Sequence, residues 1–294
     1  MRAIAPLALI ACLSQGCALG PKLATIATSF DERCSLPGVV MCVGFDNPKD
    51  VDPFIYPPWG QQEKQASIDF SHKASGAGSL RFEIPSNTAA DTSGSFWQNF
   101  STDSSIQFAE GDEFYVQWRQ RFSLEFLDTV YENGGGWKQV IIGQGDRPGK
   151  IAYSCTPIEI VVQNTYQRGY PQMYHSCGAK DGHYEPIERV LPVKYRPDEW
   201  MTFQVHVIVG SWYKNDGNYK RDSTIELWVA REGYQSQLAI SRKYYDLASE
   251  DPTASYGKIW LLPYHSGKNH EQSHPVAQTW YDDLIISTSH LPDP

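Results

Sequence analysis

Positive charge is scarce in this sequence, and so are long apolar runs. The 25 Lys and Arg residues are outnumbered by 34 Asp and Glu residues, which gives a formal net charge of -9. Nucleic-acid binding needs a basic surface, so this balance argues against DNA or RNA as a partner. The only long apolar run stands at the start of the chain, so no membrane span is predicted. Internal repeats and long Ser/Gly/Pro linkers are also missing, which favours a single domain, and we expect a monomer.

The start of the chain has the pattern of a secretory signal. Met1-Arg2 is followed by an apolar stretch over residues 3–13 and by small residues up to Gly20. A basic start, an apolar middle and a small-residue end are typical of a leader that is removed on export. We therefore predict a leader over residues 1–20, one domain over residues 21–294, and a secreted, periplasmic or extracellular protein. Lipid anchoring at Cys17 is the alternative.

Cysteine is rare, with six residues in the chain. Removal of the leader leaves four of them in an oxidising compartment, namely Cys34, Cys42, Cys155 and Cys177. We favour the pairs Cys34–Cys42 and Cys155–Cys177, because each closes a local loop that contains turn residues. A zinc site is the alternative, but no CxxC spacing supports it.

Short segments of alternating apolar and polar residues recur along the chain, whereas no long stretch keeps a helical apolar stripe. Such segments, bounded by Gly, Pro, Asn and Asp, predict β-strands. The predicted strands cover residues 79–84, 114–122, 138–142, 158–163, 172–175, 201–209, 224–230, 258–264 and 279–287. Gly134-Gly135-Gly136 predicts a turn or a flexible loop. Many strands with long connections predict an all-β protein of two packed antiparallel sheets.

The predicted strand over residues 114–122 has two different faces. Its polar face consists of Tyr115, Gln117, Arg119 and Arg121. An Arg side chain presents a planar fork of donors that matches a carboxylate, so two of them predict an anionic, oxygen-rich ligand. A solvated sheet face is the alternative.

Other predicted strands repeat this pattern, with one aliphatic face and one that carries functional groups. If these strands are neighbours, one sheet face gathers Arg119, Arg121, Gln117, Gln163, Glu159, His206, Glu226 and Trp228. Aromatic rings stack on pyranose faces, and amides and charges bind hydroxyls and carboxylates. The combination predicts a sugar-binding groove.

A series of short motifs supports a more specific hypothesis. The motifs are Gly44-Phe45-Asp46, Gly76-Ala77-Gly78-Ser79-Leu80-Arg81, Trp118-Arg119-Gln120-Arg121-Phe122, Gly136-Trp137-Lys138-Gln139, Trp200, Ile225-Glu226-Leu227-Trp228-Val229 and Trp280-Tyr281-Asp282-Asp283-Leu284-Ile285-Ile286. In this order, over roughly residues 40–290, the chain resembles the concanavalin A-like jelly-roll polysaccharide lyases. That group includes alginate lyases, glucuronan lyases and heparin lyase I-like proteins. The resemblance implies a jelly-roll sandwich with a concave groove.

The same resemblance implies β-elimination from an acidic, uronate-containing polysaccharide. Hydrogen-bond donors must neutralise the uronate carboxylate, a base must take the C5 proton, and an acid must protonate the leaving oxygen. The resemblance assigns these catalytic roles to Tyr264, His206, Arg119 and Gln139. No His follows two residues after Gln139, so His206 supplies the imidazole. The expected substrate-binding residues are Arg121, Gln117, Glu159, Gln163, Trp228, Glu226, Lys268 and His270.

The sequence also leaves open a metal site and two alternative functions. The elimination requires no catalytic metal, but a structural calcium at Asp46 and Asp283 is a possible addition, because relatives of this fold often carry one on the outer surface. One alternative function is a glycoside hydrolase that uses Glu159 and Glu226 as its carboxylate pair. The other is a non-catalytic carbohydrate-binding protein with a stacking platform of Trp228, Trp260 and Trp212.

Overall fold

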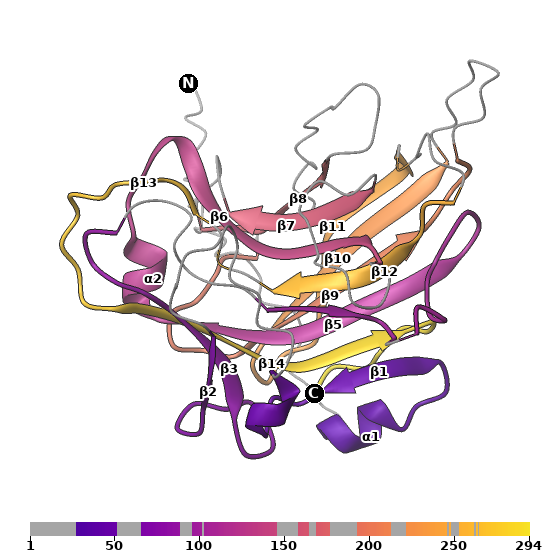
Figure 1. Ribbon diagram of the computed structural model, residues 1–294, viewed down its shortest axis with the longest axis horizontal. Helices are drawn as coiled ribbons and strands as arrows, with labels where there is room; N and C mark the ends of the chain where they lie inside the picture. Colours follow the sequence, from indigo (N-terminus) through magenta and orange to yellow (C-terminus); the bar gives the residue numbers. More distant parts are fainter. Residues whose placement is uncertain are drawn as a thin grey trace, which may run out of the picture.

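The structure, a computed structural model, describes residues 28–51, 66–88, 96–101, 103–145, 158–164, 169–176, 193–212, 222–245, 247, 253–261, 263 and 265–294. In these residues the chain forms two antiparallel sheets that pack face to face (Figure 1). The prediction of an all-β sandwich is therefore confirmed. The predicted leader, Cys17, Cys155 and Cys177 lie outside the described residues.

The larger sheet has eight strands in the order β11-β10-β9-β5-β14-β3-β2, and β1 also pairs with β14. Its strands are β1 (Val39–Val43), β2 (Ser67–Asp69), β3 (Ser79–Ile84), β5 (Glu113–Phe122), β9 (Met201–Ile208), β10 (Ser223–Arg231), β11 (Gln237–Tyr245) and β14 (Ala277–Ser287). The first and last strands of the described chain are thus neighbours in this sheet.

The smaller sheet has six strands in the order β4-β12-β6-β7-β8, with β13 paired to β6. Its strands are β4 (Phe96–Asn99), β6 (Tyr131–Gln144), β7 (Glu159–Asn164), β8 (Gln172–Ser176), β12 (Tyr256–Leu261) and β13 (His265–Lys268). Three short helical segments complete the described part of the chain: α1 (Phe30–Cys34), η1 (Pro48–Asp50) and α2 (Leu124–Asp128).

The core lies between the two sheets and is rich in aromatic rings. Phe114 and Phe122 of β5 are fully buried there, as their place on the apolar face of that strand predicts. The ring of Phe114 lies 5.5 Å from Tyr256 of β12, and the ring of Phe122 lies 5.3 Å from Trp137 of β6, measured between centroids. These contacts join the sheets, so every strand has an inner face toward the core and an outer face away from it.

The helix α1 is fastened to the outer side of the eight-stranded sheet. Ser29 and Glu32 form a capping box at its start. A disulfide links Cys34, at its end, to Cys42 of β1, which confirms the predicted Cys34–Cys42 pair. Because a helix of five residues is not stable alone, these covalent and polar links hold it in place.

The glycine run 134–136 was predicted as a turn or loop, and that prediction is wrong. These residues lie inside β6, where Gly136 pairs with Ser266 of β13. A Cβ atom on Gly135 would stand 2.1 Å from the backbone oxygen of Ser266. The glycine permits this close approach of two strands, so here it marks strand contact rather than chain reversal.

No helix in the described part of the chain is long and apolar enough to cross a membrane.

Candidate functional site

Most of the predicted polar face is assembled on the outer face of the eight-stranded sheet. Tyr115 of β5 pairs with His206 of β9, and His206 pairs with Glu226 of β10. The next row on the same face joins Gln117, Gln204 and Trp228. Arg119 and Arg121 follow on β5. The structure therefore brings together Arg119, Arg121, Gln117, His206, Glu226 and Trp228 on one face.

His206 is held by partners from its own chain. Its Nδ1 lies 3.0 Å from Oε2 of Glu226, and its Nε2 lies 2.9 Å from Oε1 of Glu113. The ring of Tyr115 stacks on the imidazole with 4.3 Å between centroids, and its hydroxyl donates to Glu113 over 2.8 Å. Burial and this bond to Glu113 raise the pKa of Tyr115. Both ring nitrogens are thus occupied, which is the arrangement of a structural histidine rather than of a base that awaits substrate.

The two arginines are also engaged. Arg119 is buried, donates to the Ala74 carbonyl over 3.3 Å and pairs with Glu232 over 3.4 Å. Arg121 pairs with Asp198 over 3.2 Å. Its guanidinium also lies over the Trp280 ring. Each positive charge therefore has a protein partner already.

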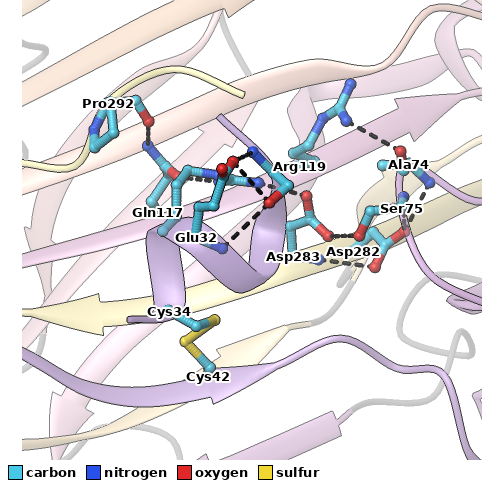
Figure 2. A network of polar contacts seen from close by, with 12 residues as sticks. Glu32, Cys34, Cys42, Ala74, Ser75, Gln117, Arg119, Asp282, Asp283 and Pro292 are labelled. Atoms are coloured by element: carbon cyan, nitrogen blue, oxygen red, sulfur yellow. Dashed lines mark hydrogen bonds and ion pairs between the residues drawn. A yellow bond between two sulfur atoms is a disulfide. The ribbon is translucent and has the colours of Figure 1, made fainter. Parts of the chain in front are cut away.

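Terminal segments cover the middle of this face. Gln117 accepts a hydrogen bond from Arg33 of α1 and donates to the Pro292 carbonyl of the C-terminal segment over 3.2 Å. Arg33 is fully buried and pairs with Asp283 over 2.6 Å. Figure 2 shows this network running from Pro292 through Gln117 to Asp283. The outer face of the eight-stranded sheet is therefore closed at Gln117 by the chain itself.

A second polar face lies on the opposite side of the sandwich, on the outer face of the six-stranded sheet. Lys258 of β12 pairs with Gly143 of β6, and Gly143 pairs with Glu159 of β7. These positions alternate with the core residues of the same strands, so they point away from the core. Gly143 contributes no side chain between the ammonium and the carboxylate. Lys258 has no exposed surface at all, and Glu159 is also buried.

Aromatic and amide side chains extend this second face. A small apolar cluster separate from the main core joins Trp260, Ile141 and Val161, with Tyr174 packed against it. The indole nitrogen of Trp260 is buried and has no hydrogen-bond partner among the described residues. Gln163 pairs with Gln172 of β8 in the next row. Aromatic surface beside amides and charges is the composition that sugar recognition needs.

Several predicted site residues do not belong to the face that carries His206. Glu159 and Gln163 were expected beside Arg119, but they lie on the other sheet, on the opposite outer face of the sandwich. The prediction that these residues share one groove is wrong. The alternating pattern gave the correct face of each strand, but it carries no information on which sheet a strand joins.

Gln139 was predicted to face the substrate and instead lies in the interior. The pairing of β6 with β7 shifts between Lys138 and Val140, so Gln139 is an extra residue in a bulge. Its side-chain oxygen accepts a hydrogen bond from the buried hydroxyl of Tyr195 over 3.0 Å. A catalytic contact of Gln139 with a polysaccharide is therefore ruled out by its position.

The remaining predicted site residues lie apart. Lys268 is buried on β13 and pairs with Tyr131 at one end of the six-stranded sheet. His270 is exposed on the loop that follows. Tyr264 lies outside the described residues, so its role remains a prediction.

The proposed calcium ligands bind protein donors instead. Asp46 accepts hydrogen bonds from the backbone of Ala77 and Gly78, and Asp283 accepts from Arg33 and Ser75. Burial and the neighbouring Asp283 raise the pKa of Asp282, which lies beside Ser75 in the network of Figure 2. Calcium takes six to eight oxygen ligands. No group of three or more His, Cys, Asp or Glu side chains in the described residues is placed to hold a metal, so these residues do not fit calcium.

The structure separates the residues that each of the two alternative functions requires. Glu159 and Glu226 lie on different sheets and on opposite outer faces, whereas the carboxylates of a glycosidase must flank one bond. The three tryptophans do not form one platform either. Trp228 and Trp260 lie on opposite outer faces, and Trp212 is part of the core.

The fold is similar to that of known polysaccharide lyases. An alginate lyase from Aplysia kurodai superposes with a TM-score of 0.58 at 13% identity, covering 85% of this chain and 99% of the other. An endo-β-1,4-glucuronan lyase from the fungus Trichoderma reesei superposes with a TM-score of 0.52 at 12% identity, covering 81% and 92%. The fold is thus that of the jelly-roll polysaccharide lyases, as the motifs predicted. By sequence, no family model and no curated protein matches the chain.

Part of the second polar face was not predicted from the sequence. Lys258, Gln172 and Tyr174 were not predicted as site residues, although each stands within a predicted strand. The signal was present in β12, where Lys258 and Trp260 alternate with the core residues Ile259 and Leu261. A buried lysine on a strand face is unusual enough to mark a candidate site.

Proposed function

We propose that this protein is a lyase that cleaves an acidic, uronate-containing polysaccharide by β-elimination on the outer face of the six-stranded sheet. The fold similarity to an alginate lyase and a glucuronan lyase supports the reaction class. The observation that carries the proposal is the buried ammonium of Lys258, which shares that face with amides, a carboxylate and two aromatic side chains.

The chemistry assigns a role to each kind of side chain. The ammonium of Lys258 neutralises the uronate carboxylate, and its burial strengthens that interaction because little water competes. The amides of Gln163 and Gln172 donate hydrogen bonds to the substrate. Trp260 offers an indole N–H and Tyr174 an aromatic ring for the sugar. On the other outer face, His206 is held between Glu226 and Glu113, and Arg119 pairs with Glu232, so we assign these groups to the stability of the fold.

Proton transfer is assigned to Tyr264. In the sequence this residue stands three positions after Leu261, the last residue of β12, the strand that carries Lys258 and Trp260. A phenol can take the C5 proton and return one to the leaving oxygen if cations lower its pKa. Lys258 is the cation that we assign to this task.

The experiment incubates the mature protein with alginate, glucuronan, pectate, heparin and a neutral β-glucan. We expect the ultraviolet absorbance of an unsaturated uronate product with at least one acidic polymer and none with the neutral glucan. Reducing ends without that chromophore, or no cleavage of any acidic polymer, would overturn the proposal.

Variants then locate the site. Tyr264→Phe and Lys258→Met are each expected to lower kcat by at least about 100-fold, the usual contribution of a proton-transfer or charge-stabilising group. Tyr115→Phe is the matched control, because it removes the same hydroxyl from the opposite outer face and should leave kcat within about twofold. Lys258→Met removes the positive charge and Lys258→Arg keeps it. Thermal unfolding of both variants shows whether a loss of activity comes from the missing charge or from a loss of folded protein. A strong effect of Tyr115→Phe with wild-type rates for Tyr264→Phe would place the chemistry on the other sheet.

A further inference from the structure

The last strand of the eight-stranded sheet contains an irregular residue, Tyr244. Lys243 of β11 pairs with Thr224, and Tyr245 pairs with Ser223, so Tyr244 has no partner on β10 and forms a bulge. Its φ angle is +59°, in the left-handed region that favours glycine and asparagine. A bulky aromatic residue in this conformation is strained, and such strain concentrates at functional positions.

The Tyr244 side chain is also unusually exposed. It has 78% of its surface accessible, the largest value among the exposed large hydrophobic side chains of the described residues, followed by Phe70 at 57%. No packing in the core therefore requires a tyrosine here. Glycine or asparagine would satisfy the backbone better, so the fold alone does not account for the ring.

The bulge lies where the edges of the two sheets meet. The next residue, Tyr245, is buried, and its hydroxyl accepts a hydrogen bond from the backbone N–H of His175 over 3.1 Å. His175 belongs to β8, the edge strand of the six-stranded sheet, and its neighbour Tyr174 belongs to the outer face that we propose for catalysis. The contact therefore places the bulge at the edge of the sandwich that β11 shares with β8.

An exposed lysine precedes the ring. Lys243 is exposed on the same edge strand. An aromatic ring stacks on the apolar face of a pyranose, and an ammonium attracts a carboxylate on the same or the next sugar. Together they suit an acidic polysaccharide better than a neutral one.

We propose that Tyr244 and Lys243 form an accessory binding site for an acidic polysaccharide, at the edge of the sandwich that β11 shares with β8. This inference rests on the proposed function, since it places a further part of the same polymer. The site binds sugars that are not being cleaved, so it affects long chains and spares short oligosaccharides.

The test measures binding and cleavage separately. Affinity electrophoresis in gels that contain alginate or glucuronan follows binding without turnover, and steady-state rates compare polymer with a trisaccharide. Tyr244→Ala is expected to weaken polymer binding about three- to tenfold, to raise KM for the polymer by the same factor and to leave kcat unchanged. Trisaccharide kinetics should not change.

Two further variants distinguish a binding role from a structural one. Phe70→Ala removes the other highly exposed aromatic ring, which follows β2 at the far edge of the same sheet, and should leave binding unchanged. Tyr244→Asn should weaken binding as the alanine does, yet raise the thermal midpoint by about 2 °C, because asparagine tolerates a positive φ. Wild-type binding by Tyr244→Ala, an equal loss in Phe70→Ala, or a fall of several degrees in Tyr244→Asn would overturn the inference. Binding that depends on Tyr244 without any unsaturated product would instead overturn only the proposed lyase activity.

Discussion

At the scale of single residues, the carboxylates of this protein show how surroundings decide a charge state. Asp69, at the end of β2, is buried, which alone would raise its pKa. Hydrogen bonds from Trp280 over 2.8 Å and from the Ser71 backbone over 2.7 Å outweigh that effect. Together with His72 and Arg81 they lower the pKa of Asp69 from 3.8 to about 2.

This lowered pKa predicts the acid sensitivity of the fold. Because the folded pKa lies below the unfolded one, Asp69 stabilises the protein fully above about pH 4 and loses that contribution between about pH 4 and pH 2. Asp69→Asn should lower the free energy of unfolding by about 2 kcal/mol at neutral pH, and the difference from wild type should vanish near pH 2. Urea unfolding at several pH values measures this. Asp31→Asn, at an exposed carboxylate, serves as control, and a pH-independent effect of Asp69→Asn would contradict the prediction.

At the scale of strands and helices, the sequence predicted the elements well where the two faces of a strand differ. The strand 79–84 was predicted with its observed bounds, and β9 and β10 within one residue at either end. Short elements such as β2, with three residues, were missed because so few positions cannot establish a period. The site could not be predicted as well, because the sequence does not show which strands pair with each other. Glu159 and Glu226 stand in equally clear alternating patterns, yet their strands belong to different sheets, and that partition depends on contacts between distant segments.

The disulfide that attaches α1 to β1 should contribute measurably to stability. The disulfide between Cys34 and Cys42 closes a short loop, with a sequence separation of 8, and ties the helix to β1. Loop-closure entropy for a loop of this size predicts that the double variant Cys34→Ala, Cys42→Ala loses about 2.5 kcal/mol of unfolding free energy.

Denaturant unfolding measures this loss, and reduced wild type should lose at least as much, because a reductant also breaks the predicted Cys155–Cys177 bond. The buried ion pair of Arg33 with Asp283 remains in both cases, so α1 should stay docked. Loss of the native far-ultraviolet spectrum in the double variant would show instead that the Cys34–Cys42 disulfide is required for the fold.

At the scale of the whole molecule, the two outer faces of the sandwich carry different side chains. One is covered by α1 and by the C-terminal segment, and the other carries Lys258, Glu159 and the small aromatic cluster. Figure 1 places the C-terminus beside α1 and β1. The contacts at Gln117 stabilise the fold, and the site that we propose for substrate lies on the opposite outer face.

Removal of the C-terminal segment tests this division. Leu291 is buried, and its backbone N–H donates to Gln204 over 3.0 Å, while the Pro292 carbonyl accepts from Gln117 over 3.2 Å. Deletion of residues 290–294 should therefore cost about 3–5 kcal/mol of unfolding free energy, from lost apolar burial and hydrogen bonds. The kcat of the folded fraction should not change, because the deleted residues lie on the face opposite to the proposed site.

The measurement combines denaturant unfolding with kcat at a temperature where the shortened protein remains folded. Leu291→Ala serves as a milder control that should lose about 2 kcal/mol and keep its activity. A shortened protein that is folded but inactive would mean that the outer face of the eight-stranded sheet takes part in catalysis. In that case Arg119 and His206, rather than Lys258, would be the groups to examine next, because removal of the tail takes from the neighbouring Gln204 and Gln117 their bonds to Leu291 and Pro292.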